Sequence, residues 1–139
     1  MYKKTITYVD FNGVEREEDF YFHLTEAEQL KLEFSENGGL SNILDSIIES
    51  DDIGRIMELF ERLIRLSYGR RTDDGKNFIK KADYADEFIA SEAWSNLFME
   101  FLNEPDTASE FVNSIVTKVA KDDDKKSIKA LIKEKTISQ

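Results

Sequence analysis

Residues 2–28 read YKKTITYVDFNGVEREEDFYFHLTEAE and predict a β-hairpin that leads directly into a capped helix. Asn12-Gly13 predicts the hairpin turn, because a type I′ turn needs positive φ at both central residues. β-Branched and aromatic residues before and after the turn favour strands. Thr25 followed by Glu28 is a capping-box pattern, which predicts the start of a helix. No reactive group lies in this unit, so it indicates a scaffold or a binding surface.

Apolar residues recur with helical spacing through most of the remaining chain. The spacing predicts helices over residues 25–36 and 40–48, a third helix whose apolar stripe runs from Ile53 to Ile64, and a fourth over about residues 82–90. It further predicts a fifth helix capped by Ser91 and a sixth that starts at Pro105. Tyr68-Gly69 is expected to close the third helix. Residues 70–76 are predicted to be a loop with a turn at Asp74-Gly75, and residues 78–79 to be extended.

Two strands followed by a run of about six helices predict an α+β, mostly α fold in a single domain. Residues 1–120 are expected to form this domain. Residues 121–139 are expected to be a charged extension, either a short helix or a frayed end. The length of 139 residues is close to the commonest size of one domain.

Composition excludes several functions. The formal net charge of −10 argues against binding nucleic acid through its phosphates, which requires clustered Lys and Arg. Cysteine is absent, so neither disulfides nor thiolate chemistry is expected. The N-terminus has no signal-peptide pattern, and no apolar run reaches the ~20 residues that span a bilayer. These features predict a cytoplasmic protein without membrane contact.

Candidate catalytic and metal sites are weak. The single histidine, His23, is expected on a strand surface, since no partnered nucleophile accompanies it. Asp73-Asp74-Gly75 lacks the alternating acids and terminal Glu of a calcium loop, so it predicts a turn. Arg70, Arg71 and Lys76 form a small basic spot without the glycine spacing of a phosphate loop. No catalytic residue, cofactor site or metal site is predicted.

The aromatic residues of the hairpin are the better functional candidates. Phe20 and Phe22 are expected on one face of the sheet, and Tyr21 with Ile6 and Tyr8 on the other. Only one face of a two-stranded sheet packs cheaply on the helices, so the other predicts a contact site. Either face can be the one that the helices leave uncovered, so we predict partner binding by all five residues. We also predict that the hairpin edge can accept a further strand.

Residues 15–19, which follow the turn, form a mostly acidic run. Charge on an edge strand discourages aggregation between edges. The alternative interpretation is an acidic contact for a basic partner. Both interpretations remain open from the sequence.

A family resemblance is carried by five segments. YVDFNGVEREEDFYFHLTEAE at residues 8–28 resembles the opening of tail assembly chaperones from long-tailed, siphovirus-type bacteriophages or prophages of Gram-positive bacteria. Further matches follow in order: GGL at 38–40, SYGRRTDDGKNFIK at 67–80, SEAWSNLFMEFL at 91–102 and ASEFVNSIV at 108–116. The resemblance covers about the first 120 residues, and the Lys- and Asp-rich tail from Lys121 departs from it.

The resemblance implies a non-enzymatic chaperone that binds the tape measure protein and keeps it soluble. It further implies that tail tube subunits are recruited around that client and that the chaperone is absent from the mature virion. Self-association into a ring or spiral, with the hairpin as an interface, is also expected. The alternative function is an acidic phage inhibitor that occupies a basic groove of a host protein. A metal-dependent hydrolase is disfavoured, since the required cluster of His, Asp and Glu is missing.

Overall fold

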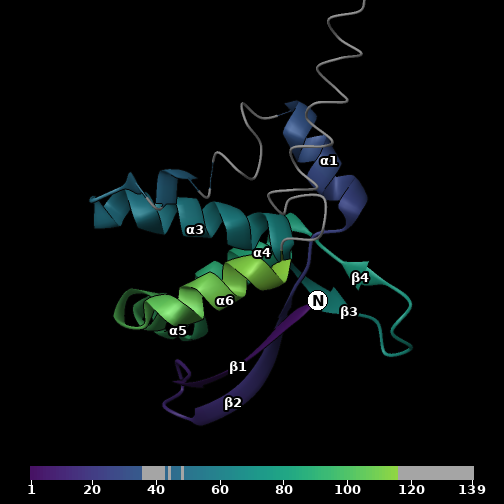
Figure 1. The fold of residues 1–139 in the computed structure, drawn as a ribbon. Coiled ribbons are helices and arrows are strands. Elements are labelled where there is room, and N and C mark those ends of the chain that lie inside the picture. Colours follow the sequence, from purple (N-terminus) through teal and green to yellow (C-terminus); the bar gives the residue numbers. More distant parts are fainter. Residues whose placement is uncertain (36–42, 44, 48, 116–139) are drawn as a thin grey trace, which may run out of the picture.

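The computed structural model describes residues 1–35, 43, 45–47 and 49–115. Its elements, in chain order, are β1 (Tyr2–Val9), β2 (Glu15–Phe22), α1 (Glu26–Ser35), α3 (Ile53–Ser67), β3 (Tyr68–Arg71), β4 (Phe78–Ile79), α4 (Ala82–Ile89), α5 (Glu92–Asn103) and α6 (Pro105–Ile115). The predicted α+β, mostly helical domain with an N-terminal hairpin is confirmed. Helices α3, α5 and α6 lie over one side of the hairpin, whose strands run beneath them (Figure 1).

The hairpin is confirmed, but the predicted type I′ turn is wrong. Gly13 has a φ of +80°, whereas no described residue other than glycine has a positive φ. The amide of Gly13 donates to the Asp10 carbonyl at 2.9 Å, and the amide of Asp10 donates to the Val14 carbonyl at 2.9 Å. These bonds define a three-residue loop with Gly13 in the left-handed position.

The longer loop changes the pairing register by one residue. A two-residue turn at Asn12-Gly13 would place Ile6 opposite Asp19, on the same face as Tyr21. In the structure Ile6 lies opposite Glu18, because the loop holds one more residue. A one-residue shift moves every side chain of a strand to the other face. The predicted grouping of Ile6 with Tyr21 is therefore wrong.

Ile6 and Tyr8 instead share the helix-covered face with Phe20 and Phe22, since directly paired residues lie on the same face. Tyr21 occupies the opposite face. The core beneath the helices is largely aromatic and aliphatic. Its most buried members include Ile6, Phe22, Leu24, Leu63, Ile64, Leu97, Phe98, Phe101, Phe111 and Ile115.

The sheet has four strands rather than the predicted two, in the order β1-β2-β3-β4 with antiparallel neighbours. The third helix closes where Tyr68-Gly69 was expected to close it, since α3 ends at Ser67 and Tyr68 is its C-cap residue. The same two residues also begin β3 and pair with Phe22 and Tyr21, which was not predicted. Extended backbone at residues 78–79 is confirmed, because these residues form β4. Both added strands are short, which explains why no strand pattern marks them in the sequence.

Three predicted helix starts are confirmed by hydrogen bonds or position. The Thr25 amide donates to Glu28 Oε1 at 3.0 Å and the Glu28 amide returns a bond to Thr25 Oγ1 at 3.1 Å, which completes the capping box. Ser91 accepts from the Trp94 amide before α5. Pro105 is the first residue of α6. The helix predicted over residues 40–48 lies largely outside the described residues, as does the extension 121–139.

Candidate partner-binding groove

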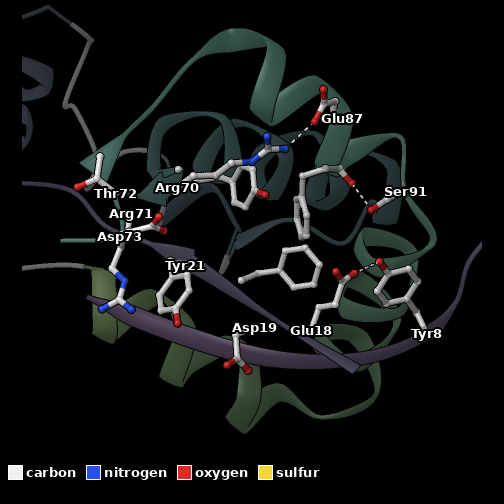
Figure 2. Close-up of a pocket in the computed structure, with 14 residues that line it drawn as sticks. Tyr8, Glu18, Asp19, Tyr21, Arg70, Arg71, Thr72, Asp73, Glu87 and Ser91 are labelled. Carbon is white, nitrogen blue, oxygen red and sulfur yellow. Dashed lines mark hydrogen bonds and ion pairs between the residues drawn. The ribbon is translucent and has the colours of Figure 1, made fainter. Parts of the chain in front are cut away.

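An open groove of about 590 Å³ lies where β2, the end of β3 and the end of α4 meet. We call it the edge groove, and its lining residues are Tyr8, Glu18, Asp19, Phe20, Tyr21, Tyr68, Gly69, Arg70, Arg71, Thr72, Asp73, Glu87, Phe88 and Ser91. Figure 2 shows Glu18 and Tyr8 at one end and Arg71 beside Tyr21 at the other. It forms because β3 pairs with β2 over only two residues before turning toward β4.

Aromatic rings make the floor of the edge groove. Phe20 lies 5.0 Å from Phe88 between ring centroids, and Tyr68 stacks on Phe88 at 4.8 Å. Tyr8 lies 6.3 Å from Phe20. Phe88 and Tyr68 are buried, whereas Tyr8 and Phe20 keep part of their surface in solvent. Offset and tilted ring pairs of this kind fix an apolar surface that an incoming side chain can cover.

Charged side chains with assigned partners form the rim. Arg70 pairs with Glu87 at 2.6 Å and lies 4.0 Å from the centre of the Tyr84 ring. Arg71 lies 4.8 Å from the centre of the Tyr21 ring. Arg70 is therefore already paired and stacked, and the hydrogen bond that it donates to the Glu87 carboxylate is the main cause that raises the pKa of Arg70. Two residues of the predicted basic spot, Arg70 and Arg71, are thus part of the groove wall, whereas Lys76 does not line the groove.

An acidic side chain closes the end of the groove near the hairpin. The Tyr8 hydroxyl donates to a carboxylate oxygen of Glu18. This hydrogen bond is the main reason that the pKa of Tyr8 rises to about 12, with burial and the Glu18 charge contributing in the same direction. Tyr8 thus stays protonated at neutral pH and holds the Glu18 carboxylate against the groove wall.

The five residues predicted to bind a partner divide into two sets. Tyr8, Phe20 and Tyr21 line the edge groove. Ile6 and Phe22 are only 5% and 0% exposed, so their side chains belong to the core in this conformation. Partner binding by the three groove residues stays a prediction. Contact by Ile6 or Phe22 would require the core to open.

Sequence reasoning missed the groove residues that follow α3 and those on α4. Arg70 and Arg71 were assigned to a solvated loop because β3 was not recognised. Phe88 lies in the helix predicted over residues 82–90, and nothing in the sequence links that helix to the hairpin. Phe88 and Phe20 carry no shared local pattern, since they meet only through the sheet and the packing of α4.

The weak catalytic and metal candidates have structural roles. His23 donates its amide to the Ser67 carbonyl at 2.8 Å, and its ring packs 6.3 Å from Phe78. Burial, the N-terminal charge and Lys80 together lower the pKa of His23. The predicted turn at Asp74-Gly75 is confirmed, since Asp74 accepts from the Lys76 amide and Gly75 has a φ of +74°. No metal-ligand cluster occurs among the described residues.

Comparisons with known proteins identify one family. A model described as phage tail assembly chaperone matches residues 1–137 of the chain. The match continues through most of residues 121–139, beyond the stretch that carried the sequence resemblance. Neither a curated protein nor a solved structure gives a significant match. Among the described residues, no helix is long and apolar enough to cross a membrane.

Proposed function

The chain belongs to the phage tail assembly chaperone family, and from this premise we propose that it binds the tape measure protein and keeps it soluble during tail assembly. Tail tube subunits are then recruited around the bound client. The family match over residues 1–137 is the observation that carries this proposal. The edge groove offers such a client an aromatic surface that is open to solvent.

The proposed mechanism is shielding without chemistry. Apolar client surface covers the exposed part of Tyr8, Phe20 and Tyr21, which removes it from contact with other client molecules. The net charge of −10 then keeps the complex dispersed, because molecules of like charge repel one another. On this proposal the chaperone acts in the cytoplasm of the infected bacterium and is not retained in the mature virion.

Co-expression with the tape measure protein of the same genome tests the proposal. The soluble, co-purifying fraction of the client should rise when the chain is present. Tyr21→Ala should reduce that fraction, since Tyr21 lines the groove without being part of the core. Met99→Ala is the matched control, because Met99 is 51% exposed on α5, outside the groove. A client that aggregates equally with and without the chain would contradict the proposal.

Self-association through the hairpin is a separate part of the proposal. The apolar tip supports it, because Val9, Phe11 and Val14 are 54%, 78% and 50% exposed. Sedimentation across a range of concentrations should show assembly that Phe11→Ser weakens. A monomer at every concentration would remove self-association while leaving client binding to be judged by co-expression.

A further inference from the structure

Strand β2 has an unpaired edge over most of its length. It pairs with β1 from Glu15 to Phe22, but with β3 only at Tyr21 and Phe22. The chain then leaves this edge, because Arg70 and Arg71 pair with β4 instead. Within the part of the chain that the structure describes, no strand therefore accompanies β2 over residues 15–20. This vacant edge runs into the edge groove.

Two backbone bonds establish which groups point toward the vacant edge. The Asp10 amide donates to the Val14 carbonyl. The backbone N–H and C=O groups of the even-numbered β2 residues therefore point toward β1. The His23 amide bonds the Ser67 carbonyl on the opposite side. By alternation, the N–H and C=O groups of Glu15, Glu17 and Asp19 point outward along the vacant edge. Among the described residues, no backbone or side-chain partner bonds these groups.

The two faces beside this edge differ in chemistry. Phe20 projects to the helix side and rests on Phe88, so an added strand would meet aromatic surface there. Glu15, Glu17 and Asp19 project to the other face and are exposed. Glu15 and Glu17 form no ion pair within the described residues, whereas Asp19 accepts a bond from Thr5 Oγ1 at 2.6 Å. On the helix side the edge thus offers the ring of Phe20, beside Arg16 and Glu18, whose charges already have partners in Asp10 and Tyr8. On the other side it offers the uncompensated negative charge of Glu15 and Glu17.

We propose that this edge receives an extended segment of a partner protein by β-strand addition. The segment alternates apolar residues, which face Phe20 and Phe88, with basic residues, which face Glu17 and Asp19. Backbone hydrogen bonds to β2 supply affinity, and the alternation supplies specificity. This inference rests on the proposed function, since it names the kind of client segment that the edge groove holds.

Charge selects this occupant over a second copy of the chain. Two β2 edges paired with each other would place acidic side chains opposite acidic side chains, and like charges in that position destabilise a sheet. A basic segment gains attraction at the same positions. The acidic edge therefore fits both interpretations of the sequence. It discourages pairing with the same edge of another copy, and it attracts a basic strand of a partner.

A single substitution isolates the backbone edge. In Glu17→Pro the ring replaces an N–H that points outward, so the ladder to β1 stays intact while an added strand loses a donor and meets the ring. Glu17→Gln is the matched control, which removes the charge and keeps the N–H. The probe is a fluorescent peptide of about nine residues that alternates valine and lysine, measured by anisotropy on the full chain.

Glu17→Pro should weaken peptide binding by at least about tenfold, and Glu17→Gln by about two- to threefold at low salt. A peptide alternating valine and glutamate should not bind. Binding should also slow exchange of the Glu15 and Asp19 amides. Equal affinity of the wild type and Glu17→Pro would overturn the proposal, as would absence of binding to the wild type. If the wild type self-associates and Glu17→Pro abolishes this self-association, a second copy of the chain is the occupant of the edge. That result would likewise overturn the proposal.

Co-expression separates this inference from the proposed function. If Glu17→Pro solubilises the tape measure protein as well as the wild type does, strand addition is not the binding mode and the chaperone function stands. If neither the wild type nor Glu17→Pro solubilises that client, the proposed function itself fails. Loss of solubilisation by folded Glu17→Pro alone, with Glu17→Gln active, supports both.

Discussion

At the scale of single residues, Gly69 shows how a close backbone approach limits the side chain. A Cβ at Gly69 would lie 2.7 Å from the Ile79 carbonyl oxygen and 2.8 Å from Phe78 Cε2. Gly69 does not have a positive φ. Its requirement is therefore space between β3 and β4, rather than an unusual backbone conformation. The sequence alone suggests a glycine that ends a helix. Glycine is common both at helix ends and where two backbone segments approach closely, so its presence does not distinguish the two roles.

Gly69→Ala should lower the free energy of unfolding by about 1–3 kcal/mol, because β4 must shift to admit the methyl group. Urea unfolding measures this change. Gly13 is the control, since it has a positive φ and no atom within 4 Å of an added Cβ. Asparagine should be tolerated at Gly13, which needs only the left-handed conformation, and should be worse than alanine at Gly69. A Gly69→Ala protein as stable as the wild type would contradict the close approach seen here.

Glu28 links the capping box to Lys80, the residue that follows β4. Lys80 Nζ lies 2.5 Å from Glu28 Oε2 and donates to the His23 carbonyl at 2.9 Å. Burial raises the pKa of Glu28, but hydrogen bonds from Lys80 and Thr25 outweigh it and leave the pKa below the usual 4.5. The carboxylate is thus stabilised by folding, and its contribution is complete above pH 4.5 and lost as the pH falls through the lower folded pKa.

In Glu28→Gln, the free energy of unfolding should therefore decrease less as the pH falls into the acid range. The cap should be preserved, since glutamine can accept the hydrogen bond from the Thr25 amide. We expect a difference of about 0.5–1 kcal/mol near neutral pH, because Glu28 is partly exposed to solvent. Urea unfolding at several pH values measures it. The pKa of His23 is also lowered, from 6.5, so its effect begins at higher pH and persists in the variant. Identical acid profiles for both proteins would refute the assigned ion pair.

At the scale of elements, β2 carries two unlike edges. Its even-numbered amides bond β1, whereas the amides of Glu15, Glu17 and Asp19 point to the vacant edge. Amide exchange followed by NMR should therefore alternate along the strand in the free protein. The amides of Arg16, Glu18 and Phe20 should exchange at least about tenfold more slowly than their odd-numbered neighbours. Uniform exchange along residues 15–20 would show that the hairpin opens as a whole or that another segment covers the edge.

Elements whose signals are local could be predicted from the sequence. The capping box of Thr25 and Glu28 and the cap at Ser91 depend on residues three positions apart, and the structure contains both. Strand β3 could not be predicted, because it pairs with the distant strand β2, and the pairing of the extended residues 78–79 with β3 was missed with it. The Tyr21–Gly69 pair, for example, joins segments separated by α1 and α3.

The candidate site shows the same division. Tyr8, Phe20 and Tyr21 were selected as exposed aromatic residues of the hairpin, and they line the edge groove. Ile6 was placed on the wrong face because the loop holds three residues instead of two, and one residue of register reverses a strand. The opposite wall of the groove comes from α4 and β3, whose position depends on tertiary packing. No local pattern in the sequence encodes it.

At the scale of the whole molecule, one aromatic cluster joins the beginning of the described chain to its end. Phe111 of α6 is fully buried and lies 5.4 Å from both Tyr2 and Phe22, between ring centroids. It also lies 5.2 Å from Phe101. The hairpin therefore has no complete apolar cover until α6 is in place. Contacts between such distant segments favour unfolding in a single cooperative step.

Phe111→Ala should accordingly lower the free energy of unfolding by about 3–5 kcal/mol, which is a large part of the stability typical of one domain. Phe111→Leu is the control, since it retains most of the buried volume and should cost less. The single tryptophan, Trp94, is buried in α5 and reports packing by fluorescence, while far-UV circular dichroism reports the helices. In the wild type both signals should change at the same urea concentration. If Trp94 changed first, the packing around α5 would be lost while the helices persisted, and the shared aromatic cluster could not be what holds the two ends of the fold together.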